Sequence, residues 1–124
     1  SNIYTRFMKT TLLAKSSSGA PYDVTFSVLE GLMTVHCSCK AGLLQQQCKH
    51  KRALVSGDKE LLFDQSQTEL LKQILATREC QLLVERLAVE ESALVSIERE
   101  KSRLAAEEKA LKRNIGQLFV RGER

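Results

Sequence analysis

The sequence contains a single proline, Pro21, and between Gly57 and Gly116 it has neither proline nor glycine. Because these two residue types interrupt helices, their absence allows an uninterrupted helical region there. No run approaches the roughly 18 to 20 consecutive apolar residues that a membrane helix needs, and nothing near the start has the pattern of a secretory signal. We therefore expect a soluble, intracellular protein, cytoplasmic or, in a eukaryotic cell, nuclear.

Groups that could support catalysis are also scarce. The chain has only two histidines, His36 and His50, no glycine-rich loop that could cradle phosphates, and no base beside Cys80. Its 124 residues have room for one compact domain and an extended element, but not for a large enzyme core. We therefore expect that the protein is not an enzyme and that Cys80 is an ordinary thiol within a helix.

The positive charge is concentrated in the first half of the chain. Residues 1–57 hold seven basic and two acidic side chains, a formal charge of +5, whereas residues 58–124 hold twelve basic and thirteen acidic ones, a formal charge of −1. The net charge of +4 therefore belongs to the first half. We divide the chain into a small domain, residues 1–57, and a long helical region, residues 58–124.

The first half has the pattern of a small sheet. Residues 6–15 are apolar and rich in β-branched side chains, residues 22–29 alternate between apolar and polar, and residues 32–39 follow a tight turn at Glu30-Gly31. These segments predict an antiparallel meander of three strands, although residues 6–15 are also compatible with a helix. The side chains expected on one face of the second strand are Tyr22, Val24, Phe26 and Val28.

Three of the four cysteines and both histidines lie within residues 36–50. Cys37 and Cys39 are two residues apart at the end of a predicted strand, so their thiols project to the same side. Cys48 is expected just before the first turn of a helix, where backbone amides can hydrogen-bond a thiolate, and His50 within that turn. Three thiolates and one imidazole form a closed tetrahedral set, so we predict a structural zinc ion bound by Cys37, Cys39, Cys48 and His50.

Two alternatives for these residues are weaker. A disulfide between Cys37 and Cys39 would close a small strained ring, and intracellular proteins rarely keep such bonds. His36 could replace His50 as the fourth ligand, but on a strand it points to the face opposite Cys37 and Cys39. We expect His36 to face solvent or a turn instead.

The pattern Cys37-x-Cys39, a loop, then Cys48-x-His50, with a hairpin before it and a short helix after it, resembles the SWIM-type zinc finger. The resemblance covers about residues 20–57 and does not extend to the second half. In that family the ββα finger is assigned to DNA binding or to protein interaction, and it usually accompanies a helicase, transposase or ligase domain. The resemblance therefore implies a zinc-binding recognition module.

The second half predicts a long helix. Ser66-Gln67-Thr68-Glu69 has the pattern of a capping box, and residues 70–119 are mostly helix formers. Eleven positions along this helix alternate in spacing between four and three residues, which is typical of a coiled-coil seam. Three of them are charged, namely Glu90, Lys101 and Glu108. The eight apolar ones are Leu83, Leu87, Leu94, Ile97, Leu104, Leu111, Ile115 and Leu118.

Together these segments predict an α+β fold: a small antiparallel sheet with a ββα zinc finger, followed by a long α-helix in a coiled coil or helical bundle. We expect the helix to form a homodimer or small homo-oligomer. Four basic residues flank the metal ligands, and we expect them to bind the backbone of DNA or RNA. They are Lys40, Lys49, Lys51 and Arg52. The alternative is a protein interaction adapter whose zinc is structural and whose helix recognises a partner.

Overall fold

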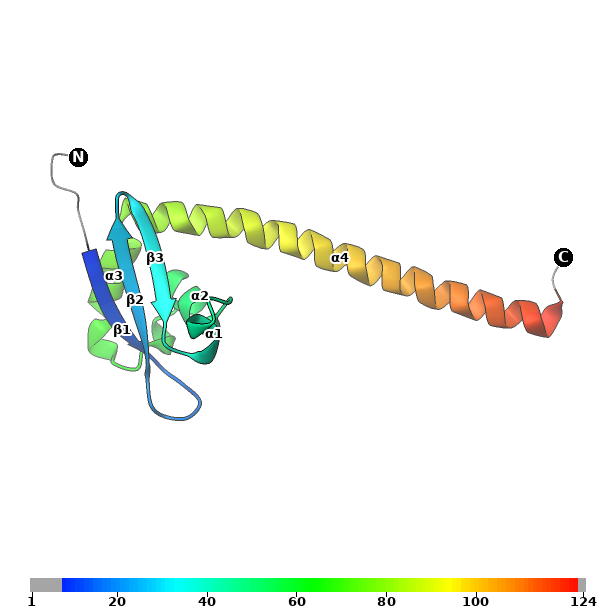
Figure 1. The fold of residues 1–124 in the computed structure, drawn as a ribbon, viewed down its shortest axis with the longest axis horizontal. Coiled ribbons are helices and arrows are strands. Elements are labelled where there is room, and N and C mark those ends of the chain that lie inside the picture. The colour runs from blue at the N-terminus through cyan, green and yellow to red at the C-terminus, as the bar shows by residue number, and fades with distance from the viewer. Residues whose placement is uncertain (1–7, 123–124) are drawn as a thin grey trace. The chain divides into compact units, whose positions relative to one another are not determined.

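A computed structural model of the chain describes residues 8–122 and shows an α+β fold (Figure 1). A three-stranded sheet comes first in the chain, and helices follow it, ending with a long one. The contacts between residues divide the chain into two compact units, the first ending at Arg86 and the second beginning at Leu87. The α+β class predicted from the sequence is therefore confirmed.

The sheet is an antiparallel meander of strands β1 (Met8–Ala14), β2 (Tyr22–Leu29) and β3 (Leu32–Cys37), in that order. The alternative of a helix at the first of these segments is wrong, and residues 6 and 7 of the predicted strand lie outside the described residues. Glu30 and Gly31 both have positive φ, 54° and 79°, as a two-residue type I′ hairpin turn requires. This turn pairs Leu29 with Leu32 and fixes the register up to Val24 and Cys37.

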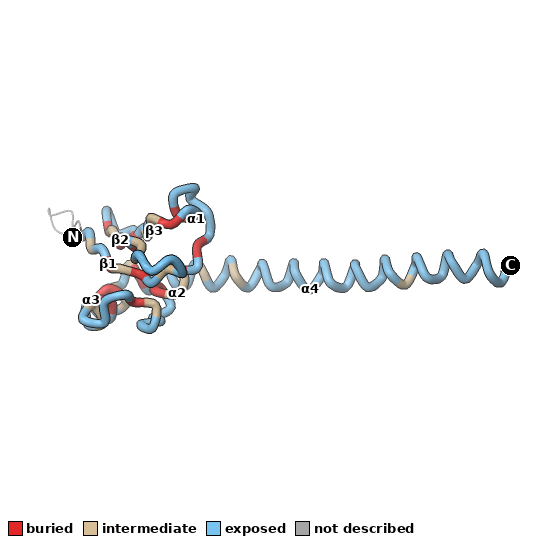
Figure 2. Tube along the Cα trace, turned by 90° about the horizontal axis from the view of Figure 1, so that it is seen from below, coloured by how far each residue is buried: buried red, intermediate tan, exposed pale blue. Residues whose placement is uncertain are grey.

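The core of the first unit lies against one face of the sheet, because burial alternates along each strand. Figure 2 shows that the buried segments gather in this unit. Strand β2 buries Val24, Phe26 and Val28 and leaves Tyr22 half-buried, so the predicted face of this strand is confirmed. Leu12 and Ala14 of β1 and Met33 and Cys37 of β3 complete the sheet side of the core, as the period of two dictates. Apart from Cys39, Cys48 and Cys80, the buried apolar residues that follow the sheet in sequence are Leu54, Val55, Leu62, Leu71 and Ile74.

Two short helices and two 3-10 turns follow the sheet. They are α1 (Lys40–Leu43), α2 (Lys49–Val55), η1 (Lys59–Leu61) and η2 (Gln65–Gln67). The segment between η1 and η2 runs beside the outer edge of β1. The Lys15 amide donates to the Leu61 carbonyl at 2.8 Å, the Phe63 amide to the Leu13 carbonyl at 2.9 Å, and the Leu13 amide to Gln67 Oε1 at 3.0 Å. These bonds satisfy backbone groups that an open strand edge would leave unpaired.

The helical region differs from the prediction at two points. Ser66 does not cap a helix; it lies in η2, and Asp64 Oδ1 accepts hydrogen bonds from its amide and its hydroxyl. The predicted unbroken helix is divided into α3 (Thr68–Leu75) and α4 (Arg78–Arg121). Thr77 causes the break without glycine or proline, because its Oγ1 accepts from the Cys80 amide at 3.2 Å and so caps α4.

The second unit contains the rest of α4, residues 87–121, whose side chains are almost all exposed (Figure 2). Ion pairs on its surface join Arg103 to Glu100 and Glu107, and Lys112 to Glu108. Within residues 8–122, no helix combines the length and the apolar composition that crossing a lipid bilayer requires.

Candidate metal centre

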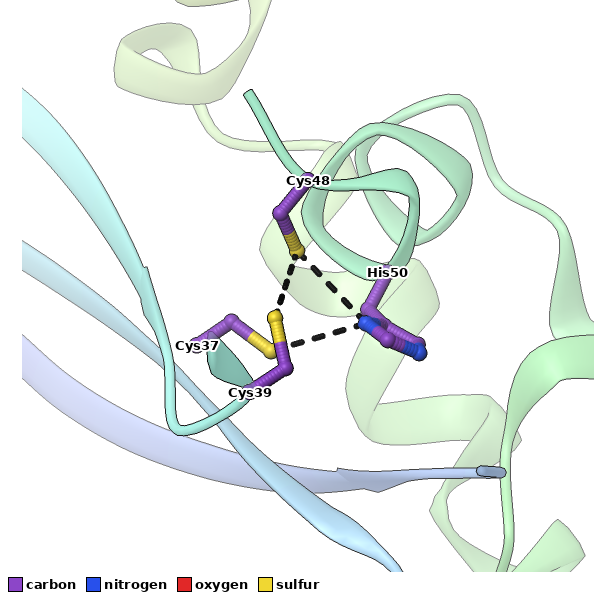
Figure 3. A group of neighbouring side chains, drawn as sticks. All are labelled: Cys37, Cys39, Cys48 and His50. Atoms are coloured by element: carbon purple, nitrogen blue, oxygen red, sulfur yellow. Dashed lines mark hydrogen bonds between the residues drawn. The ribbon is translucent and has the colours of Figure 1, made fainter. Parts of the chain in front are cut away.

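Four side chains from three consecutive elements converge on one buried point (Figure 3). Cys37 is the last residue of β3, and Cys39, after one further residue, is the N-cap of α1. Cys48 is the N-cap of α2, and His50 lies in the first turn of that helix. The predicted third strand, residues 32–39, ends at Cys37 because Cys39 leaves the sheet to cap α1.

The distances among the four ligand atoms suit a tetrahedral metal ion. Cys39 Sγ lies 3.5 Å from Cys48 Sγ, and His50 Nδ1 lies 3.6 Å from Cys48 Sγ and 3.8 Å from Cys37 Sγ. All four atoms lie within 4.8 Å of one another. For metal–sulfur bonds of about 2.3 Å and a metal–nitrogen bond of about 2.0 Å, a tetrahedron has edges of about 3.5 to 3.8 Å. The group can therefore hold a metal ion with little rearrangement.

Backbone amides hold two of the sulfur atoms in place. The Gly42 amide donates to Cys39 Sγ at 3.3 Å, and the Lys51 amide donates to Cys48 Sγ at 3.4 Å. Each bond joins an N-cap side chain to an amide of the first helical turn that has no partner within the helix. The same contact that begins each helix therefore orients one of the candidate ligands.

Gly42 is required by the close approach of α1 to the end of β3. A Cβ atom at this position would lie 2.1 Å from the carbonyl oxygen of Cys37 and 2.9 Å from its Cβ. No side chain fits in that space without moving the backbone that carries the first ligand. Sequence reasoning did not single out Gly42, because this contact depends on the path of the loop.

The protonation of the group without metal follows from burial and hydrogen bonding. Burial raises the pKa of Cys37 to about 12. Burial acts in the same direction on Cys39, but hydrogen bonds from the Gly42 amide and from the neighbouring thiols outweigh it and lower the pKa of Cys39. Burial, and then the charge of Lys49, lower the pKa of His50, so its imidazole is neutral and can act as a ligand. A cation among these atoms would compensate the thiolate charge that burial disfavours.

Tyr22 lies beside the fourth ligand. Its ring centroid is 4.9 Å from that of His50, with the two planes inclined by 57°. The sequence places Tyr22 on the buried face of β2, and the register set by the turn at Glu30-Gly31 brings that end of β2 to the ligands. The proximity of Tyr22 to the ligands could therefore be inferred from the sequence, although Tyr22 is not among the predicted site residues.

The other candidate residues lie outside the ligand group. His36 is exposed and paired with Thr25 on the sheet face opposite Cys37. Cys80 is fully buried near the start of α4, and burial raises the pKa of its thiol. The basic residues flank the ligands as the sequence requires. Lys40 and Lys49 are the first residues of α1 and α2 and are exposed, whereas Lys51 and Arg52 are half-buried.

Comparisons of the chain with models of protein families, with curated proteins and with solved structures find no match. The function must therefore be inferred from the site itself.

Proposed function

We propose that the first unit is a zinc-binding module of the SWIM type and that its metal is structural. The observation that supports this best is the set of four buried ligand atoms within 4.8 Å of one another. Thiolates are soft ligands, and three of them with one imidazole form a set common in structural zinc sites. The spacing Cys37-x-Cys39 and Cys48-x-His50, on a hairpin followed by a short helix, supports the SWIM type.

We propose no catalytic role for this metal. Three cysteines and a histidine would occupy all four tetrahedral positions, so no position is left for a water or substrate molecule. The four ligand residues are also between 0% and 6% exposed, which restricts access to the ion. The role that remains is to hold β3, α1 and α2 together in a unit whose apolar core is small.

The basic residues beside the metal are proposed to bind the phosphate backbone of nucleic acid. Lys40 and Lys49 are exposed at the starts of two helices that the same ligand group holds together, and Lys51 is half-exposed nearby in sequence. Residues 1–57 carry a formal charge of +5. Contacts of this kind give binding that depends on salt and only weakly on sequence.

Two experiments test this function. Elemental analysis of protein purified without chelator should find one zinc ion per chain. Titration of short duplex and single-stranded nucleic acids at two salt concentrations should show binding that weakens as salt rises. The variant Lys40→Gln/Lys49→Gln should bind more weakly to every sequence and show a smaller salt dependence.

A matched control removes the same charge elsewhere in the first unit. Lys9 and Lys72 are exposed, on β1 and α3, and Lys9→Gln/Lys72→Gln should bind nearly as well as the wild type. Equal binding by the wild type and by Lys40→Gln/Lys49→Gln would refute the role of the lysines. Absence of any salt-dependent binding would refute the nucleic-acid function and favour the protein adapter.

The second unit is proposed to join two copies of the module. Six apolar residues of its seam are between 46% and 60% exposed, and a second helix can bury this face. They are Leu94, Ile97, Leu104, Leu111, Ile115 and Leu118. Two linked modules would bind one polyanion more tightly than either alone, because the second contact becomes intramolecular. Sedimentation equilibrium should return the mass of a dimer.

A further inference from the structure

The charged residues of the α4 seam constrain how two copies of this helix can pair. In heptad positions, Leu87, Leu94 and Lys101 occupy position a, and Glu90 and Ile97 occupy position d. Glu108 also falls at a, and Leu104 at d. Glu90, Lys101 and Glu108 lie on α4, with exposed side chains, among apolar residues that would be buried by a partner helix. Buried charges are tolerated only where an opposite charge or a hydrogen-bond partner meets them.

A parallel dimer places like charges together. In a parallel pair with two-fold symmetry, each a or d residue faces the same residue of the second copy. Glu90 would face Glu90, Lys101 would face Lys101, and Glu108 would face Glu108. All three contacts are repulsive and lie in the least solvated part of the interface. The parallel arrangement is therefore opposed at three of the eleven seam positions.

An antiparallel dimer pairs each a residue with a d residue, and one alignment brings opposite charges together. We propose that two copies of α4 pair antiparallel in this alignment, with Lys101 of each copy facing Glu90 of the other. The same alignment places Leu87 against Leu104 and Leu94 against Ile97. By symmetry every contact occurs twice, so the pairing has two buried ion pairs between apolar layers.

Neighbouring antiparallel alignments lack this complementarity. A shift by one heptad toward the C-terminus brings Glu90 opposite Glu108, and a shift by two heptads places all three charged residues against apolar ones. In the proposed alignment Glu108 meets Leu83 at the end of the paired region, where water can reach a carboxylate. The region buries Leu94, Ile97 and Leu104 of the exposed seam. Leu111, Ile115 and Leu118 lie beyond it, because the residues opposite them are at or before the start of the partner's α4. The charges that flank the seam neither favour nor oppose this alignment. It brings Arg86 near Glu107, which is an attractive pair, but it also brings Glu91 near Glu98, which is a repulsive pair. The seam charges therefore decide the alignment, as a polar residue at a core position commonly does.

This inference rests on the proposed self-association of α4, and charge reversal in the full-length protein tests both. The dimer dissociation constant is measured by analytical ultracentrifugation for the wild type and for Glu90→Lys, Lys101→Glu and the double variant. Each single change puts like charges together, so we expect the dissociation constant to rise by about tenfold or more. The double variant Glu90→Lys/Lys101→Glu restores the opposite charges and should return to within about threefold of the wild type.

Glu108→Lys is the matched control, since it makes the same charge reversal in the same seam. Because Glu108 is not part of the ion pair, we expect its dissociation constant to change by less than about threefold. Circular dichroism at high protein concentration checks that each variant keeps its helix. A wild type that stays monomeric refutes the self-association and the alignment with it. A dimeric wild type whose single variants bind as tightly, or whose double variant fails to recover, refutes the antiparallel alignment alone.

Discussion

A Cβ atom on Gly42 would lie 2.1 Å from the carbonyl oxygen of Cys37, closer than two such atoms can approach. Gly42→Ala must therefore displace α1, the end of β3, or both, and with them the ligands Cys37 and Cys39. We expect this variant to bind zinc at least about tenfold more weakly, because displaced ligands lose the closed tetrahedral geometry. Competition with a chromogenic chelator measures the affinity.

Gly116→Ala controls for the change of glycine to alanine. Gly116 lies in α4, and a Cβ atom there meets nothing within 4 Å. The zinc affinity of this variant should equal that of the wild type, and its helix should be slightly more stable. An unchanged affinity in Gly42→Ala would show that the loop relaxes without moving the ligands.

Removal of zinc is expected to unfold the first unit. Apparent binding energies of structural zinc in finger peptides, about 10 to 16 kcal/mol, are as large as the total stability of ordinary domains, about 5 to 15 kcal/mol. Cys37→Ser should lower the zinc content and the protection of the sheet amides from hydrogen exchange. Cys80→Ser removes another buried thiol and should leave the zinc content unchanged. Equal zinc contents in the two serine variants would contradict the ligand assignment.

Phe26 supports the core directly. Its side chain is fully buried at the centre of β2, and Phe26→Ala should lower the free energy of unfolding by about 3 to 5 kcal/mol. Phe63, which is 49% exposed, provides the same truncation at the surface of the first unit. We expect Phe63→Ala to have a clearly smaller effect in urea unfolding with zinc present. Similar losses in both variants would show that Phe26 is not the centre of the core.

Cys80 is expected to reduce stability at alkaline pH. Burial raises the pKa of its thiol above the ordinary value of 9.0, so above that pH the unfolded chain loses a proton that the folded chain keeps. Stability therefore falls as pH rises through this range, by at most about 1.4 kcal/mol per pH unit. Urea unfolding at pH 8 and pH 10 should show a smaller decline in Cys80→Ala than in the wild type. Parallel declines would mean that the thiol ionises equally in both states.

The parts of the structure that were predictable from the sequence are those that depend on neighbouring residues. The alternation in β2 and the turn at Glu30-Gly31 fix the hairpin, and the hairpin register carries Cys37 to the place where β3 ends. The spacing of Cys48 and His50 then places both at the start of α2. The four side chains meet because these local rules act together.

The remaining features depend on contacts that the sequence does not reveal by periodicity. The hydrogen bonds of Leu61 and Phe63 to the edge of β1 join segments about fifty residues apart, and no pattern in either segment indicates the other. The predicted capping box is absent: Asp64 caps η2 through its bonds with Ser66, and Gln67, the N-cap of α3, makes no side-chain capping bond. At the break before α4, one threonine ends a helical pattern that contains no glycine or proline.

The backbone bonds along the edge of β1 also determine how the protein can be divided. A fragment that ended at Gly57 would keep all four metal ligands and lose Leu61 and Phe63, which pair with Lys15 and Leu13. The outer strand would then present unpaired amides and carbonyls to other molecules, as aggregating strands do. The smallest fragment suitable for fusion to another protein therefore includes the residues after Gly57 that pair with the outer edge of β1.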